Sequence, residues 1–450
     1  MGILYNLCID VLIMHRKDDL RQVISEWFLQ ELPDTIERDI SIPLDTSIIV
    51  SIIGPRRAGK TFTMYTIIKK LREHIPMGNI LYINFEHEKL RNLDANDLGD
   101  MLAIYYEVSK VNRKEKIYLF LDEIHVVSGW SNWVNRISET KEFHIYLSGS
   151  SSKLLSRELS TRLRGRSIDF TVFPYSFREF LRVTEVLIQD PNLLIHSEKR
   201  GTIMGALEEY IKIGGYPEVV GLKDLGSKLL RSYIDTIIIK DVGERFRIEP
   251  SILAAFFDYA ISTYSKYFTG SKAYNYLKTL NYRVSREFPL ELMEHFTEVF
   301  ALFQTEIFSF SAKSKKQYPR KIYVADTGII QTKVRNAEIG RLIENLVFIE
   351  LCKRSEYFTK FQVYYWKEYG KAAGKEVDFV IMEGSKVLEL MNVTYASSGE
   401  TVPAREISGI LLAAKELKCS KKRIITWDYF ENGDIEFTPL WKWLLETEMG

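Results

Sequence analysis

The stretch Gly54-Pro-Arg-Arg-Ala-Gly-Lys-Thr61 fits the phosphate-loop pattern G-x-x-x-x-G-K-[ST] at every fixed position. The apolar, β-branched run Ser47–Ile53 before it predicts a buried parallel strand, and the segment from Phe62 to Arg72 has helical spacing. A loop between a strand and a helix N-terminus presents backbone N–H groups and the positive end of the helix dipole to an anion. The sequence therefore predicts a binding site for a nucleoside triphosphate.

The residues of this loop have separate expected roles. We expect Lys60 to reach the β- and γ-phosphates and the Thr61 hydroxyl to bind Mg²⁺. The chain has no Asn-Lys-x-Asp motif of the kind that reads guanine, which favours ATP over GTP. The residues predicted to contact the nucleotide are Gly54, Pro55, Arg56, Arg57, Ala58, Gly59, Lys60, Thr61 and Phe62.

A second motif lies at the end of the apolar run Ile117–Asp122, where Glu123 follows directly. Ligands of open α/β sheets bind at the carboxyl ends of the strands. We therefore expect Asp122 to hold Mg²⁺ and Glu123 to orient and deprotonate the attacking water. The alternative is that the two acids only begin a surface turn, but their position after a phosphate loop favours the functional interpretation.

Polar side chains also end the next predicted strand, Phe143–Ser148. Ser148 is the residue that we expect to sense the γ-phosphate or the attacking water. The alternative is a helix N-cap, because serine favours that position. The residues that would serve as the cap are Ser150, Ser151 and Ser152.

Four arginines crowd the segment before the last predicted strand of this region: Arg157, Arg162, Arg164 and Arg166. A planar guanidinium group is well suited to stabilising charge on a transferring phosphate. One of them could act on the nucleotide of its own chain or across a subunit interface. Alternatively, the cluster is a solvated surface.

The composition is that of an ordinary globular protein, with 46% hydrophobic and 27% charged residues. The net charge of +1 gives no overall basic field, so any nucleic-acid-binding surface must be local. The cysteines Cys8, Cys352 and Cys419 form no C-x-x-C pair, which argues against a zinc site or a disulfide framework. We find no pattern of a signal peptide or a membrane span, and we expect a cytoplasmic protein with no membrane partner.

The motifs occur together in an order that resembles a known family. They are the phosphate loop, Leu121-Asp-Glu-Ile-His125, Leu147-Ser-Gly-Ser-Ser151, Leu163-Arg-Gly-Arg-Ser167, Phe173-Pro-Tyr-Ser-Phe177, Gly214-Gly-Tyr-Pro-Glu-Val219, Ile239-Lys-Asp-Val242, Lys321-Ile-Tyr-Val-Ala-Asp-Thr-Gly328 and Gly374-Lys-Glu-Val-Asp-Phe-Val380. The family comprises archaeal and bacterial AAA-type ATPases whose C-terminal half is a domain of unknown function with a degenerate nuclease-like fold. The resemblance implies that Arg166 is the functional arginine and that a winged-helix unit lies near residues 250–310.

The periodicity and the resemblance together predict an α/β protein with several domains. These are an N-terminal helical segment (1–45), a P-loop ATPase core with a five-stranded parallel sheet (46–178), a helical lid (179–248), a winged-helix-like domain (249–318) and a restriction-endonuclease-like α/β domain (319–450).

A nuclease of the restriction-endonuclease class places an Asp on one strand and an acidic residue plus Lys on the next, often with a helix Glu. Glu344 and Asp378 match the helix and first-strand positions, but aligning the next strand puts Asn392 and Thr394 at the positions of the acid and the lysine. A rival register uses Glu389 with Met391 and also lacks the lysine. We therefore expect a DNA-binding or scaffolding relic rather than an active nuclease. The alternative is that Glu344 and Asp378 are ordinary helix and strand charges.

Basic residues flank the predicted winged-helix-like domain. They are Lys272, Lys278, Arg283, Arg286, Lys313, Lys315, Lys316, Arg320 and Lys321. Such clusters neutralise phosphates, but a solvated loop would have the same composition. The sequence thus predicts Mg²⁺-dependent hydrolysis of ATP to ADP, with DNA, another protein or a second copy of the chain as open partners. The alternatives are a slow ATP-dependent switch or signalling scaffold, and an ATP-gated nuclease.

Overall fold

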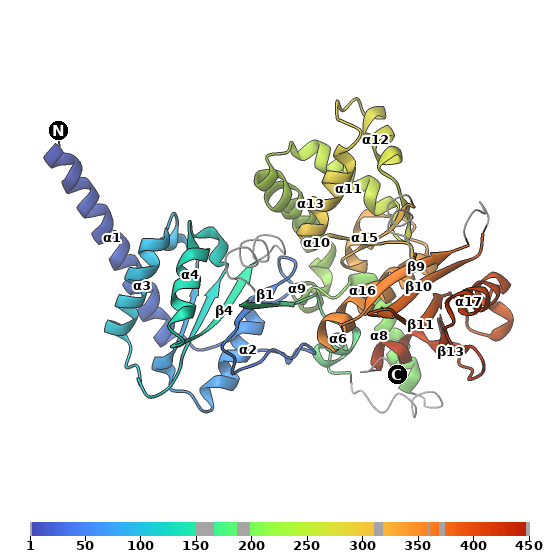
Figure 1. The fold of residues 1–450 in the computed structure, drawn as a ribbon, viewed down its shortest axis with the longest axis horizontal. Coiled ribbons are helices and arrows are strands. Elements are labelled where there is room, and N and C mark those ends of the chain that lie inside the picture. The colour runs from blue at the N-terminus through green and yellow to red at the C-terminus, as the bar shows by residue number, and fades with distance from the viewer. Residues whose placement is uncertain are drawn as a thin grey trace. The chain divides into compact units, whose positions relative to one another are not determined.

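The computed structural model describes residues 2–149, 166–186, 199–309, 318–358, 360–368 and 374–446 (Figure 1). The chain divides into two compact units, Met1–Val172 and Phe173–Gly450. Among the described helices, none combines the length and the apolar character that crossing a bilayer requires.

The first unit is built on a five-stranded sheet in the order β2-β3-β4-β1-β5, in which every pair is parallel. Its strands are β1 (Ile49–Ile53), β2 (Ile80–Asn84), β3 (Ile117–Asp122), β4 (Phe143–Gly149) and β5 (Ser167–Thr171). The helices α2 (Lys60–Arg72), α3 (Ala95–Val108) and α4 (Trp130–Glu139) lie between the strands in the sequence. The parallel core that the apolar runs predicted is therefore confirmed.

The N-terminal helix α1 (Gly2–Leu29) packs against this core. The indole N–H of Trp27, which is buried, donates a hydrogen bond of 2.8 Å to the carbonyl of Ile80 at the start of β2. Residues 30–48 form no helix, so the helical segment predicted for residues 1–45 ends at Leu29.

The second unit begins with helices. They are α6 (Phe177–Val183), α8 (Lys199–Ile213), α9 (Pro217–Gly221) and α10 (Gly226–Thr236), and a π-helical segment, Ile237–Glu244, continues α10. The helical character predicted for residues 179–248 agrees with the described part of this region. Its role as a lid stays a prediction.

Three helices and three strands follow in the region predicted to be a winged-helix-like unit, and that assignment stays a prediction. They are α11 (Pro250–Ser262), β6 (Lys266–Phe268), α12 (Gly270–Thr279), α13 (Phe288–Glu298), β7 (Leu302–Thr305) and β8 (Arg320–Val324). The strands form an antiparallel sheet in the order β6-β8-β7. Its central strand, β8, lies beyond the boundary predicted between residues 318 and 319.

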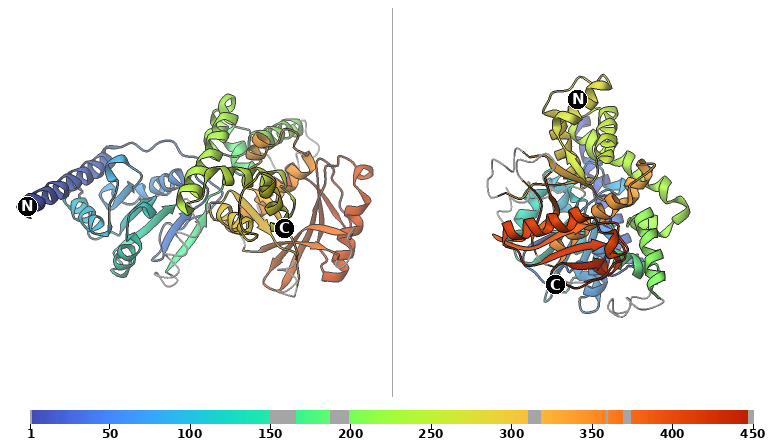
Figure 2. Two further views of the ribbon diagram at one scale, coloured as in Figure 1. Left: turned by 90° about the horizontal axis from the view of Figure 1, so that it is seen from above. Right: turned by 90° about the vertical axis from the view of Figure 1, so that its right-hand side faces the viewer.

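After α15 (Thr327–Lys333), the chain forms a mixed five-stranded sheet in the order β13-β12-β11-β10-β9. Its elements are α16 (Ile339–Tyr357), β9 (Gln362–Lys367), β10 (Glu376–Glu383), β11 (Lys386–Val393), α17 (Ala404–Leu417), β12 (Lys422–Thr426), β13 (Glu436–Pro439) and α18 (Leu440–Leu445). Helix α17 lies across one face of the sheet (Figure 2). Its Ile410 shares a buried core with Trp366 and Leu390, and this core joins β9, β11 and α17.

Candidate functional site

The phosphate loop follows β1 and depends on two glycines with positive φ. Gly54 has φ 141° and Gly59 has φ 100°. A Cβ atom at Gly54 would lie 2.1 Å from the carbonyl oxygen of Val172, which leaves no room for any side chain. Helix α2 begins at Lys60, directly after the second glycine, so its first N–H groups face the loop.

The side chain of Lys60 is folded into this loop and is only 5% exposed. Its Nζ donates hydrogen bonds of 3.2 Å to the carbonyl oxygens of Gly54 and Pro55, and it lies 3.8 Å from Oε1 of Glu123. The ammonium group is therefore held inside the cradle. A phosphate placed there would meet a cation already positioned to receive it.

Asp122 lies at the end of β3 and is fully buried. Its carboxylate accepts hydrogen bonds from the hydroxyls of Thr61 (2.7 Å) and Tyr82 (2.8 Å), and a third from Ser148. Burial raises the pKa of Asp122, and the charge of Glu123 raises it further, while the three hydroxyl donors oppose this shift. Thr61 and Asp122, predicted to hold the metal together, are thus in direct contact.

Glu123 follows with φ 53°, a left-handed conformation that is uncommon outside glycine and that occurs at functional sites. Its Oε2 lies 3.2 Å from Nδ1 of His125, but the two buried atoms lack hydrogen-bond geometry. Burial acts to raise the pKa of Glu123, yet the positive charge of Lys60, with contributions from His125 and Arg56, lowers it to about 2. The side chain is therefore an ionised carboxylate at neutral pH.

Ser148 links the two acids. Besides donating to Asp122, its hydroxyl accepts a hydrogen bond of 2.9 Å from the backbone N–H of Glu123. The residue is fully buried at the end of β4. Its predicted role in sensing the γ-phosphate stays a prediction. The alternative cap residues, Ser150, Ser151 and Ser152, lie outside the described residues.

Arg166 lies far from the phosphate loop of its own chain. Its carbonyl accepts a hydrogen bond from the N–H of Ile49, so it lies beside the amino end of β1, whereas the loop follows the carboxyl end. The length of β1, at about 3.3 Å per residue, separates the two. The exposed guanidinium lies 3.0 Å from Glu139. The other three arginines of the cluster, Arg157, Arg162 and Arg164, are outside the described residues.

The remaining side chains of the loop make contacts away from the Thr61–Asp122 pair. Phe62 is 51% exposed and lies at the edge of the Tyr65 ring, while Arg56 forms an ion pair of 3.2 Å with Glu86. Arg57 has φ 68°. Their contacts with nucleotide, and that of Ala58, stay predictions.

Sequence reasoning missed three residues of this site. The Tyr82 hydroxyl binds Asp122, His125 lies beside Glu123, and Nη1 of Arg38 donates a hydrogen bond of 3.1 Å to the carbonyl of Ala58. Tyr82 reaches Asp122 because β2 is the neighbour of β3, and this strand order is known only from the structure. For Arg38, in an irregular segment, the sequence offers no comparable signal.

The nuclease-like positions of the last domain are also resolved. The backbone N–H of Asp378 donates a hydrogen bond of 3.0 Å to Oδ1 of Asn392 on the neighbouring strand, so Asn392 takes the place of the second acid. Glu389 instead pairs with Arg423 at 2.9 Å. It is opposite Ile381 rather than Asp378.

Comparison with known proteins gives three family matches along the chain. An AAA domain matches residues 46–181, and two domains of unknown function, DUF8612 and DUF4143, match residues 204–338 and 339–442. An uncharacterized protein of Methanocaldococcus jannaschii, MJ1544, is 33% identical over 91% of both chains. An uncharacterized protein of Haemophilus influenzae is 28% identical over 89% of this chain and 95% of its own.

Among solved structures, the chain is similar to Aeropyrum pernix ORC1 in complex with DNA, with 13% identity, a TM-score of 0.30, and coverage of 73% of this chain and 93% of that one. It is also similar to the Thermotoga maritima RuvB Holliday junction branch migration motor, with 17% identity, a TM-score of 0.24, and coverage of 65% and 89%. The AAA match and the match to MJ1544 over nearly the whole length place the chain in a family of AAA-type P-loop ATPases that carry a C-terminal domain of unknown function.

Proposed function

We propose that this protein binds ATP with Mg²⁺ and hydrolyses it to ADP and phosphate in the first unit. The observation that carries the proposal is the direct contact between Thr61 of the loop and Asp122 at the end of β3. A hydroxyl and a carboxylate are hard oxygen ligands, which suit Mg²⁺. These two residues would hold the ion, which would neutralise charge on the phosphates.

The residues around this pair have matching tasks. Lys60 would exchange its bonds to two loop carbonyls for the β- and γ-phosphates, because an anion is the stronger acceptor for an ammonium donor. Glu123 would orient the attacking water through its carboxylate, whose Oε2 is buried without a hydrogen-bond partner. Ser148, on β4, would hold Asp122 and Glu123 in place through its hydrogen bonds to both residues.

Calorimetry on nucleotide-free protein tests the proposal. ATP and a non-hydrolysable analogue should bind in the presence of Mg²⁺, while GTP should bind more weakly. Lys60→Ala should abolish uptake, and Lys69→Ala, which removes a lysine of the same helix outside the loop, should leave it intact. If folded wild-type protein took up neither ATP nor the analogue, the proposal would be refuted.

The contacts of Glu123 favour a slow switch over a motor. Its carboxylate lies 3.8 Å from Nζ of Lys60 and 3.2 Å from Nδ1 of His125. Basic groups on both sides favour the ionised carboxylate, which reduces its tendency to take a proton from water. We therefore propose slow basal turnover, which a partner accelerates by changing the surroundings of Glu123. Steady-state assays with and without candidate partners measure this directly.

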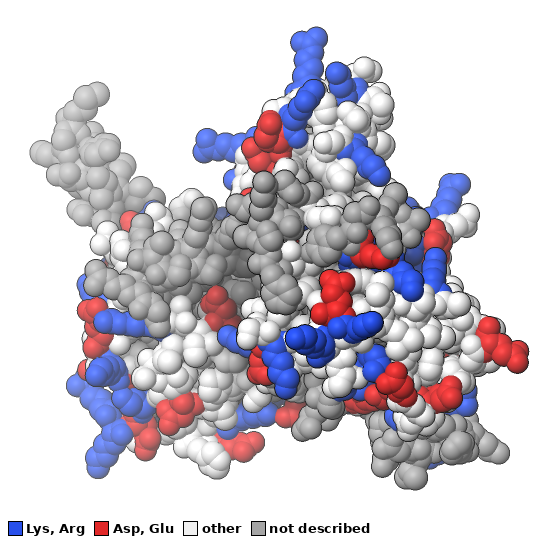
Figure 3. Space-filling model, turned by 45° about the vertical axis from the view of Figure 1, so that its right-hand side comes forward, with Lys and Arg blue, Asp and Glu red and all other residues white. Residues whose placement is uncertain are grey.

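DNA is a candidate partner through the winged-helix-like unit. Lys272, Lys278, Arg283 and Arg286 are all exposed, on α12 and the segment after it. Figure 3 shows basic side chains gathered at the top of the molecule, where α12 lies, with acidic ones beside them. The acidic residues Glu287, Glu291 and Glu294 are exposed on α13 and just before it, which would weaken binding along that helix.

The other basic residues predicted here contribute less to such a surface. Lys321 is buried, so it cannot reach a DNA backbone, and Arg320 lies 3.1 Å from Glu306. Lys313, Lys315 and Lys316 are outside the described residues. A mobility-shift assay at stated salt should detect DNA binding that is weakened in the Lys272→Ala/Lys278→Ala variant. Binding unaffected by this change would exclude the surface around α12.

A further inference from the structure

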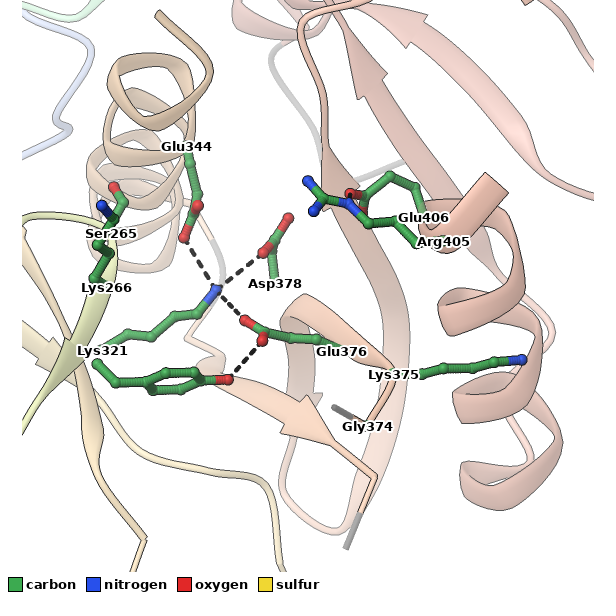
Figure 4. A pocket seen from close by; sticks show the side chains of 11 residues that line it. Ser265, Lys266, Lys321, Glu344, Gly374, Lys375, Glu376, Asp378, Arg405 and Glu406 are labelled. Atoms are coloured by element: carbon green, nitrogen blue, oxygen red, sulfur yellow. Dashed lines mark hydrogen bonds and ion pairs between the residues drawn. The ribbon is translucent and has the colours of Figure 1, made fainter. Parts of the chain in front are cut away.

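An ammonium group is buried at the centre of a carboxylate cluster in the second unit. Nζ of Lys321 lies 2.6 Å from Oε1 of Glu376, 3.0 Å from Oδ1 of Asp378 and 3.2 Å from Oε1 of Glu344. Figure 4 shows the lysine entering from one side and the three acids converging on its tip. The Lys321 side chain is only 4% exposed.

The four residues come from different parts of the second unit. Lys321 is on β8 of the winged-helix-like sheet, Glu344 is on α16, and Glu376 and Asp378 are on β10. They line a cavity of about 450 Å³, whose rim carries Lys266, Lys375 and Arg405. The cluster thus joins the winged-helix-like sheet to the nuclease-like domain.

Each carboxylate has a further donor that fixes its place. The Tyr267 hydroxyl donates to Glu376 at 2.6 Å, the Tyr323 hydroxyl to Glu344 at 3.0 Å, and the N–H of Val393 to Asp378 at 3.0 Å. Burial would lower the pKa of Lys321, but the surrounding acids hold it well above its usual range. The lysine is therefore the cation that balances the charge of the partly buried acids.

This arrangement does not fit the metal that a nuclease of this fold would use. Glu344 and Asp378 are at the positions where such an enzyme would hold a divalent cation, but both contact Lys321 instead. Nowhere in the described residues does the structure present three acidic, His or Cys side chains disposed to hold a metal ion. In addition, the sequence has Asn392 and Thr394 where alignment with the nuclease pattern requires an acid and a lysine.

We propose that the Lys321 ammonium is a built-in replacement for the divalent cation of a nuclease centre. The centre therefore takes up no divalent cation in the native protein. Its acids instead connect β8 to α16 and β10 through their ion pairs with Lys321. Removing the ammonium should leave three partly buried carboxylates without a counter-charge and create a site for a hard divalent cation such as Mn²⁺.

The test uses full-length, nucleotide-free protein and measures Mn²⁺ uptake and the melting temperature. Wild type and Asp378→Asn should take up the same amount of Mn²⁺. Lys321→Ala should melt at a lower temperature, take up one Mn²⁺ ion per chain more than wild type, and be restabilised by it. The double variant Lys321→Ala/Asp378→Asn should lose this gain, and Lys375→Ala, which removes a lysine of the cavity rim, should never show it.

Two results would overturn the proposal. One is Mn²⁺ uptake by wild type that Asp378→Asn abolishes, because a metal would then displace the lysine. The other is a folded Lys321→Ala protein that gains neither Mn²⁺ affinity nor thermal recovery. If Lys321→Ala does not fold, Lys321→Met keeps most of the side-chain volume and serves in its place. The comparison of wild type with Asp378→Asn remains decisive without either variant.

Discussion

At Glu123, ATP binding and ATP hydrolysis can be separated by a single substitution. Replacing the carboxylate by an amide in Glu123→Gln keeps the shape of the site and leaves Lys60 free to bind phosphate. We expect ATP affinity close to that of wild type and turnover reduced by about 10²-fold or more. Glu139→Gln, which changes an exposed glutamate of the same unit, should alter neither ATP affinity nor turnover. Undiminished turnover in Glu123→Gln would remove this residue from the reaction.

Tyr82 offers a prediction on pH dependence. Its hydroxyl donates to Asp122 and so favours the ionised carboxylate, whose pKa burial has already raised. Tyr82→Phe removes this donor, so the pKa of Asp122 should rise further. The acidic limb of kcat/KM should then move to higher pH, since Asp122 must be ionised to hold Mg²⁺. Tyr105→Phe, which loses a hydrogen bond to Gly78 away from the site, should leave the limb in place. An unshifted limb in Tyr82→Phe would contradict this role.

At the scale of elements, the strand–loop–helix unit around Gly54 depends on backbone shape. A methyl group at Gly54 would collide with the backbone of Val172, and φ 141° is itself closed to alanine. Gly54→Ala should therefore lower the melting temperature and abolish ATP binding. The matched change Gly99→Ala lies in α3 with open space around it, and should stabilise that helix by about 1 kcal/mol. Thermal melts and ATP calorimetry on both variants test this prediction. ATP binding by Gly54→Ala would refute the requirement for glycine at this position.

The elements also show what the sequence could and could not predict. Apolar runs located β1, β3 and β4 because these strands are buried on both faces, and spacing brought Thr61 and Asp122 to one edge. The contact of Tyr82 with Asp122 depends on the order of the strands, which no local pattern encodes. Similarly, Lys321 was read as part of a basic surface. Its burial comes from pairing β8 with β6 and β7, and from acids more than twenty residues away.

At the scale of the whole molecule, the position of Arg166 predicts self-association. It lies beside the amino end of β1, away from the phosphate loop of its own chain, so any action on nucleotide must be across an interface. Arg166→Ala and Glu123→Gln should each reduce turnover when assayed alone. Mixed together, they should regain part of it, because the Glu123→Gln chain supplies an arginine to a site whose Glu123 is intact. Wild-type turnover per chain should also rise with protein concentration.

The mixing experiment separates an arginine acting between chains from one that only supports the fold. Arg166 holds Glu139 in an exposed ion pair, and such pairs contribute about 1 kcal/mol or less to stability. Arg166→Ala should therefore melt close to the wild-type temperature, and Glu139→Gln, which breaks the same pair, should keep full turnover. If Arg166→Ala kept wild-type activity at every protein concentration, the arginine would have no part in catalysis. If activity fell but mixing restored nothing, action across an interface would be excluded.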